Sequence, residues 1–329
     1  MIALMTKSPS MPFGIGTTFD YSIPFEHMIP MLARAGFSYI TLGGGNIAHS
    51  GYDTEEGRAA ILRTVQAAGI AIDSVHAPFG QDCDISVPDV RIEIPSQAQP
   101  DVRQDTGAVI APGAVNGAER TQETSPVVPA SPATRRLSAA PERLEAVASV
   151  RKAIDACAAL GARTVVIHPT DRFPVEQTRS RIQALRDSLR ELLAFANRQG
   201  VRLALENMPS LVEMQVFDSV LEEFPDLGVC YDTSHAQLSG NTFGILQRYQ
   251  DRIITTHISD NLGREDDHML PYEGVIEWDE FAYYFGRVKQ LQCFMLEVEV
   301  RRSRFKDTRE FLDQALRRAQ RLRGYHKEH

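Results

Sequence analysis

Six short apolar runs of this chain each end in a side chain that can bind a metal ion. The runs read A-I-D-S-V-H, T-V-V-I-H-P, R-L-A-L-E-N, G-V-C-Y-D-T, I-I-T-T-H-I-S and F-M-L-E-V-E, and the side chains are those of His76, His168, Glu206, Asp232, His257 and Glu297. Each run is β-branched or aliphatic, is too short for an isolated helix and precedes a helical pattern, which is typical of parallel strands buried on both faces. Strands that close into one barrel bring their carboxyl ends to one rim, where barrels of this kind keep their chemistry. The six residues therefore form a candidate metal site.

Glu206, Asp232, His257 and Glu297 are the oxygen-rich part of this set. Three carboxylates and one imidazole suit a hard or borderline divalent cation, Mn²⁺, Mg²⁺ or Co²⁺. Any one of them alone would more often be an ion-paired strand end. Four in register on successive strands favour a shared metal ion.

Three further side chains extend the set to nine potential ligands. His235 follows Asp232 by three residues in Y-D-T-S-H-A, and Asp266 and His268 form a D-x-H pair in the stretch after His257. The two side chains of such a pair point the same way if the backbone is extended. The alternative for this D-D-H stretch is a solvated charged loop, whereas loops that carry Asp and His beside a metal site commonly serve that site.

Two more strand candidates, at 13–19 and 38–43, precede the six and bring the count to eight. Amphipathic helical patterns lie between the strands, at about 24–36, 55–69, 142–161, 175–199, 213–224, 242–251, 278–290 and 307–323. Several of these patterns stop at a glycine, such as Gly36, Gly69 and Gly200, as a left-handed helix cap requires. Eight strand–helix alternations predict a (β/α)8 TIM barrel, an α/β fold in a single domain, rather than an open doubly wound sheet.

One segment does not fit the alternation. Residues 86–140 hold seven of the chain's 18 prolines, and no Phe, Tyr or Trp occurs between Phe79 and Phe173. Such a stretch buries too little apolar area to offset its ordering entropy, so we predict a disordered insertion after the third strand. The barrel itself would then comprise 1–85 and 141–329. The insertion is either a tolerated surface feature or a lid or tether beside the rim, and the first interpretation is favoured because long surface insertions cost little.

The composition predicts a soluble cytoplasmic protein. The chain has 329 residues, 43% of them hydrophobic, and a net charge of −8, which argues against dependence on a nucleic-acid backbone. Its four cysteines show no C-x-x-C pairing, as expected in a reducing compartment. We expect no secretion signal, no membrane span and no membrane partner.

The order of the motifs carries a family resemblance. The strings S-V-H-A-P, I-H-P, L-E-N, Y-D-T-S-H-A, H-I-S-D-N, D-D-H-M-L-P-Y-E-G and L-E-V-E follow one another along the chain. In that order they resemble the xylose-isomerase-like TIM barrel superfamily, which holds sugar-phosphate isomerases and epimerases, related tautomerases and dehydratases, and endonuclease IV. The resemblance covers about 13–83 and 141–323 and leaves out the insertion.

In the isomerase and epimerase branch, the resemblance implies that Glu206, Asp232, His257 and Glu297 hold one divalent metal ion. The ion would stabilise an enediolate of a small open-chain sugar or sugar phosphate. Glu206 and Glu297 would remove and return the proton, and His235 and Arg264 would orient substrate oxygens, with His76 and His168 lining the pocket. The partner is then a small-molecule sugar, and a homo-oligomer is left open.

In the endonuclease IV branch, the resemblance implies a different use of the same rim. His76, His168, Glu206, Asp232, His235, His257, Asp266, His268 and Glu297 would hold three Zn²⁺ ions that activate a hydroxide for attack on a phosphodiester at an abasic site. The acidic balance, and the absence of a basic loop with aromatic residues to penetrate a duplex, favour the isomerase branch and no nucleic-acid partner. A third alternative is an inactive barrel that binds a metabolite, against which the intact Glu206 and Glu297 pair speaks.

Two further motifs remain. Arg301, Arg302 and Arg304, just beyond the last strand, could hold a phosphate in either branch or could form a solvated charge run. The string Y-E-G-V-I-E-W at 272–278 is similar to a motif of the superfamily in which glycine is usual at the position of Tyr272. Trp278, the only tryptophan, is expected to pack in the core rather than to stack on a substrate.

Overall fold

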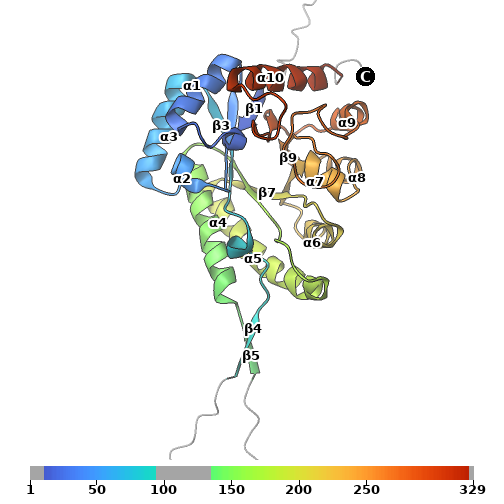
Figure 1. Ribbon diagram of the computed structural model, residues 1–329. Helices are drawn as coiled ribbons and strands as arrows, with labels where there is room; N and C mark the ends of the chain where they lie inside the picture. The colour runs from blue at the N-terminus through green and yellow to red at the C-terminus, as the bar shows by residue number, and fades with distance from the viewer. Residues whose placement is uncertain (1–10, 94–134, 326–329) are drawn as a thin grey trace, which may run out of the picture. The chain divides into compact units, whose positions relative to one another are not determined.

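The structure is a computed structural model that describes residues 11–93 and 135–325 (Figure 1). Within these residues the chain divides into two compact units, 11–88 with 139–325 and 89–93 with 135–138. None of the helices in the described ranges is long and apolar enough to cross a membrane. The larger unit carries all the predicted site residues.

The larger unit is built on one eight-stranded parallel sheet. Its strands follow the order β10-β1-β2-β3-β6-β7-β8-β9. Their bounds are Phe13–Gly16 (β1), Tyr39–Leu42 (β2), Ala71–His76 (β3), Thr164–Ile167 (β6), Arg202–Glu206 (β7), Gly228–Asp232 (β8), Ile253–His257 (β9) and Phe294–Leu296 (β10). The eight predicted strands are thus all present, although the first ends at Gly16 and residues Thr17–Phe19 form a 3₁₀ turn.

A small set of bonds between β9 and β10 closes the sheet into a barrel. The Ile258 amide donates to the Met295 carbonyl at 3.0 Å, and the Glu297 amide donates to the Ile258 carbonyl at 3.1 Å. Two residues earlier in the chain, the Thr256 hydroxyl takes the place of a backbone partner. It donates to the Met295 carbonyl and accepts from the Met295 amide, each at 3.2 Å. The predicted TIM barrel is therefore confirmed, with its one incomplete ladder beside Glu297.

Helices lie outside the barrel between successive strands (Figure 1). They are Phe25–Ala35 (α1), Ile47–Ser50 (α2), Glu55–Ala68 (α3), Pro141–Ala159 (α4), Thr178–Gln199 (α5), Leu211–Leu221 (α6), Thr233–Leu238 (α7), Gly244–Tyr249 (α8), Trp278–Phe285 (α9) and Thr308–Tyr325 (α10). Left-handed glycines end α1, α3 and α5, as predicted for Gly36, Gly69 and Gly200. The short helices α2 and α7 lie where the sequence showed no helical period.

The alternation of side chains along the strands separates two buried regions. Val165, Leu203 and Val229 belong to the main core, which packs the strands against the helices. Val166, Ala204, Cys230 and Ile254 form a second buried cluster, which fills the inside of the barrel. On β1 a glycine makes room inside, because a Cβ at Gly14 would lie 2.4 Å from the Met295 Cε atom.

The smaller unit is an antiparallel pair of strands. Val90–Glu93 (β4) pairs with Arg135–Ser138 (β5), so that Val90 lies opposite Ser138 and Glu93 opposite Arg135. Both strands fall inside the predicted insertion 86–140, whose composition gave no sign of them. Residues 94–134 of that insertion lie outside the described residues.

Candidate functional site

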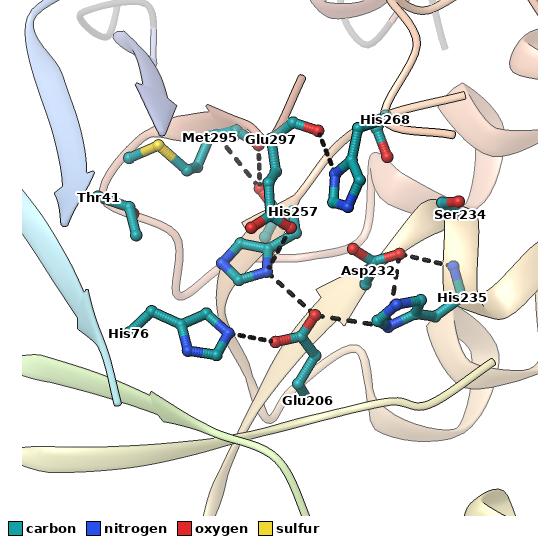
Figure 2. Close-up of polar contacts among 12 residues, drawn as sticks. Thr41, His76, Glu206, Asp232, Ser234, His235, His257, His268, Met295 and Glu297 are labelled. Atoms are coloured by element: carbon teal, nitrogen blue, oxygen red, sulfur yellow. Dashed lines mark hydrogen bonds and ion pairs between the residues drawn. The ribbon is translucent and has the colours of Figure 1, made fainter. Parts of the chain in front are cut away.

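All six strand-end residues reach the same rim of the barrel. His76, Glu206, Asp232 and His257 are the last residues of β3, β7, β8 and β9. His168 and Glu297 each follow their strand by one residue, after β6 and β10. Because parallel strands present their carboxyl ends at one edge, the side chains converge there. Figure 2 shows those of His76, Glu206, Asp232, His257 and Glu297.

Glu206 lies at the centre of the group. Its Oε2 atom is 3.1 Å from His76 Nε2 and 3.4 Å from His168 Nε2. Its Oε1 atom is 3.1 Å from His257 Nδ1 and 3.5 Å from His235 Nδ1. Four imidazoles therefore surround one buried carboxylate. Dashed lines in Figure 2 join those of His76, His235 and His257 to Glu206.

The four residues predicted to bind one metal ion come together. Glu206, Asp232, His257 and Glu297 each offer a ligand atom, and these atoms lie within 4.8 Å of one another. Asp232 Oδ1 accepts from the His235 amide at 2.6 Å, whereas Asp232 Oδ2 is buried without a hydrogen-bond partner among the described residues. A buried carboxylate oxygen without a partner is costly, and a bound cation would satisfy it. The donor set thus fits a divalent ion.

The other predicted ligands form two more groups around this one. His76, His168 and Glu206 also bring ligand atoms within 4.8 Å of one another. Asp266 Oδ2 is 3.2 Å from His235 Nε2 and 2.8 Å from His268 Nε2. The D-x-H pair meets in this way although the backbone at His268 is left-handed, with φ 48°, rather than extended.

The electrostatics of the rim favour positive charge. Burial acts to raise the pKa of Glu206, but His257 and His168 hold it well below its usual range. Burial also acts to raise the pKa of Glu297, but the neighbouring His257 lowers it to about 2.

The pKa of Asp232 rises to about 7, first through burial and then through the carboxylates around it. Burial opposes the charged form of His268, yet Asp266 raises its pKa to about 10. The carboxylates of the rim thus stabilise the protonated, positively charged form of the histidines, and the same carboxylates would stabilise a bound cation.

Sequence reasoning missed three residues that lie beside the predicted ligands. Asn207 clamps the end of β8, because its side chain donates to the Asp232 carbonyl at 2.9 Å and accepts from the Asp232 amide at 2.8 Å. The Ser234 hydroxyl donates to Asp266 Oδ1 at 2.6 Å. Cys230 lies two residues before Asp232 and, with Glu206 and His257, forms a further group of atoms within 4.8 Å. The sequence could have indicated Cys230, because residues two apart in a strand lie on the same face and Asp232 is a predicted ligand.

Asp260 organises the loop that carries Asp266 and His268. Its carboxylate accepts from the Gly274 amide at 3.0 Å, the Ile276 amide at 3.2 Å and Trp278 Nε1 at 2.9 Å. Trp278 is buried and belongs to the main core, which confirms its predicted packing. Tyr272 has φ 69°, in the left-handed region that favours glycine, which explains why glycine is usual there.

Arg264 and the arginine cluster do not join the ligands. Arg264 is exposed and forms no hydrogen bond or ion pair with another described residue, so its role toward a substrate stays a prediction. Arg301 pairs with Glu299, Arg302 lies 3.9 Å from Asp267, and Arg304 lies 3.3 Å from Glu273.

An eight-stranded parallel barrel with a ring of carboxylates and imidazoles at its carboxyl rim defines the class as a TIM-barrel protein with a candidate metal centre. A family model described as xylose isomerase-like TIM barrel matches residues 92–323, and the chain belongs to this family. The predicted superfamily is thereby confirmed. Among its relatives, the protein y4fM of Sinorhizobium fredii is 30% identical over 242 residues, which cover 68% of this chain and 76% of that protein. The Mycoplasma pneumoniae protein named probable endonuclease 4 is 28% identical over 171 residues, covering 44% of this chain and 58% of that one.

Solved structures share the fold at low sequence identity. A D-tagatose 3-epimerase-like protein superposes with a TM-score of 0.65 at 18% identity, over 96% of this chain and 97% of that chain. The IOLI protein, whose structure contains a zinc atom, superposes with a TM-score of 0.67 at 14% identity, over 97% of this chain and 100% of that chain.

Proposed function

We propose that the protein is a divalent-metal-dependent isomerase or epimerase of a small sugar or sugar phosphate. The observation that carries this proposal is the convergence of Glu206, Asp232, His257 and Glu297, with the unpaired Asp232 Oδ2 among them. The family, and structural neighbours such as the D-tagatose 3-epimerase-like protein, support it. The four cysteines, all free thiols, support a cytoplasmic location.

These four side chains would hold the metal ion. When bound, Mn²⁺, Mg²⁺ or Co²⁺ would polarise the carbonyl and the adjacent hydroxyl of the sugar and lower the energy of the enediolate. Zn²⁺ would suit the larger set of nine residues.

Glu206 and Glu297 would move the proton. Both have a pKa below the usual range, so at neutral pH both are carboxylates and either can accept a proton from the carbon next to the carbonyl. They flank His257, whose Nδ1 atom is 3.1 Å from an oxygen of each. The Glu297 side chain is 15% exposed and that of Glu206 only 2%, so Glu297 would be the more accessible of the two to a substrate.

A second candidate is an endonuclease IV-like phosphodiesterase with three zinc ions that acts on abasic DNA. Two observations favour it: the His76, His168 and Glu206 group, and the contacts of Asp266 with His235 and His268. Both oxygens of Glu206 lie beside imidazoles, as in a carboxylate that bridges two ions. The relative named probable endonuclease 4 points the same way.

Proton exchange tests the two candidates directly. The metal-loaded protein is incubated in D₂O with a panel of ketoses and their phosphates, and NMR follows deuterium incorporation at the carbon beside the carbonyl. We expect incorporation into at least one sugar and no cleavage of a duplex with a single abasic site. Cleavage without exchange would overturn the isomerase proposal in favour of the nuclease.

A further inference from the structure

Asn207 takes the place of a backbone partner where β8 extends beyond β7. The ladder between these two strands ends at Glu206 and Cys230. The ladder between β8 and β9 continues as far as Asp232 and His257. At Asp232 the Asn207 side chain makes both contacts that a neighbouring strand would make. It donates to the Asp232 carbonyl at 2.9 Å and accepts from the Asp232 amide at 2.8 Å.

Two more hydrogen bonds join Asn207 and Asp232 to His235. The His235 amide donates to Asp232 Oδ1 at 2.6 Å. In the ring of the same residue, Nδ1 lies 2.9 Å from the Asn207 carbonyl oxygen and 3.5 Å from Glu206 Oε1, so the carbonyl is the nearer partner. Asn207, Asp232 and His235, all of them buried, thus form a closed cycle of four hydrogen bonds.

The cycle determines which atoms of Asp232 and His235 are left for the site. Asp232 Oδ1 is bonded to the His235 amide, so the oxygen left for a cation is Oδ2, which is buried and has no hydrogen-bond partner among the described residues. A backbone carbonyl can only accept, so His235 Nδ1 carries a proton and donates it to Asn207. The nitrogen left for the site is Nε2, which lies 3.2 Å from Asp266 Oδ2.

The amide side chain of Asn207 suits this position because it donates and accepts at the same time, as a peptide group does. Alanine in its place would leave the buried N–H and C=O groups of Asp232 without these partners. The end of β8 would then be free to shift relative to Glu206, the last residue of β7. A metal site tolerates only about 0.2 Å of change in its ligand distances, so a small shift would weaken the hold on an ion.

We propose that Asn207 is a positioning residue, which directs Asp232 Oδ2 toward the metal ion and His235 Nε2 toward the substrate. The proposal rests on the proposed metal-dependent function and adds to it a residue whose side chain contacts neither the ion nor the sugar. Loss of a group that orients a metal ligand lowers the affinity for the metal about 10- to 100-fold. We therefore expect the role of Asn207 to be visible in metal binding itself, without any substrate.

The first measurement is the affinity for Mn²⁺, obtained by titrating the metal-free protein and following the free ion by electron paramagnetic resonance. We expect Asn207→Ala to bind Mn²⁺ about 10- to 100-fold more weakly than the native protein. Asn261→Ala is the matched control, because Asn261 is a buried asparagine in the loop after β9 whose side chain bonds Ser234 and Gly263 instead of a proposed ligand of the ion. Thermal unfolding should show a similar loss of stability in both variants, with native Mn²⁺ affinity in the control.

Two results of this titration would overturn the proposal. The first is native Mn²⁺ affinity in Asn207→Ala, and the second is an equal loss of affinity in Asn207→Ala and Asn261→Ala, which would show a general loss of structure. If Asn207→Ala does not fold, Asn207→Ser takes its place, because a hydroxyl can replace one of the two bonds to Asp232. Weaker Mn²⁺ binding is expected there as well, and native affinity would again count against the positioning role.

The second measurement detects the ring protons of the ¹⁵N-histidine-labelled protein by NMR, with and without Mg²⁺, and uses His235→Gln to assign the signal. We expect a proton on His235 Nδ1 that exchanges slowly with solvent, because it is buried and bonded to the Asn207 carbonyl. Its exchange should stay slow in Asn261→Ala and become faster in Asn207→Ala. A native His235 with its proton on Nε2 alone would overturn the proposal. If the native protein binds no divalent ion, the proposed function fails, whereas this signal still decides whether Asn207 holds His235.

Discussion

At the scale of single residues, Glu206 is the most heavily used side chain of the rim. Its two oxygens contact His76 and His168 on one side and His257 and His235 on the other. A carboxylate in this position can serve as ligand and as proton acceptor only if it stays ionised, and the histidines hold its pKa low enough for that. Its charge, rather than its shape, is therefore what the site needs.

Substitutions that keep shape and remove charge test this requirement. Glu206→Gln and Glu297→Gln should each lower the rate of sugar proton exchange about 10³-fold, since general acid–base catalysis contributes roughly that much. The rates are compared by NMR with those of the control Glu223→Gln, in which Glu223 pairs with Arg186 and Arg190 away from the rim. Thermal unfolding shows that the variants are folded. If both variants keep substantial exchange activity, the acid–base assignment is wrong.

A second buried carboxylate has no place in the proposed chemistry. Asp73 on β3 accepts a hydrogen bond of 2.9 Å from the Thr255 hydroxyl. Burial raises its pKa above the ordinary value of 3.8, despite the bonds from Thr255 and Cys293. A group with a raised pKa in the folded state contributes stability below its unfolded pKa and loses it as the pH rises through the folded value.

We therefore expect Asp73→Asn to raise the Tm at pH 7, because asparagine accepts the same bond without an ionisation cost. The gain should shrink as the pH falls through 4 and below, toward the range where the native carboxyl is protonated in both states. Calorimetry of both proteins across this range measures the difference. A gain that does not depend on pH, or a loss at pH 7, would contradict the account of Asp73.

At the scale of elements, the segment from Asp260 to Trp278 behaves as one unit. The Asp260 carboxylate bonds three N–H groups between Gly274 and Trp278, and the loop that carries Asp266 and His268 lies between the two ends. Gly274 permits this close approach, since a Cβ there would lie 2.1 Å from the Asn261 carbonyl oxygen. Two predicted ligands thus depend on a residue outside the ligand set.

Loss of the Asp260 acceptors should loosen this segment. We expect Asp260→Ala to lower the free energy of unfolding by about 3 kcal/mol, because it leaves several buried N–H donors unpaired. Asp260→Asn, which keeps one acceptor oxygen, should cost less. Denaturant unfolding followed by the fluorescence of Trp278, the only tryptophan, reports both stability and the local environment. Equal stability of all three proteins would show that Asp260 does not hold the loop.

At the scale of the whole molecule, the barrel was predictable because its signals are repetitive. Eight apolar runs, the helical periods between them and glycine caps such as Gly36 all describe the same fold. The convergence of the ligands followed from the parallel strands. The short helices α2 and α7 were not predictable, because four to six residues are too few to show a period.

The contacts that support the site could not be predicted from the sequence. Asp260 and Asn207 bind backbone groups 14 to 25 residues away, and backbone partners leave no pattern in the sequence. The pairing of each arginine after β10 with a carboxylate is likewise visible only in three dimensions. The pair β4 and β5 arises from a composition that predicts disorder, and the rest of that insertion is outside the described residues.

Metal analysis of the purified protein, coupled to activity, tests the central proposal most directly. Metal is removed with a chelator, restored as Mn²⁺ or Co²⁺, and counted per chain in the native protein and in Asp232→Asn. We predict about one exchangeable ion per native chain, none in the variant, and sugar proton exchange that disappears and returns with the ion. About three tightly held zinc ions per chain, together with cleavage of abasic DNA, would contradict the proposal.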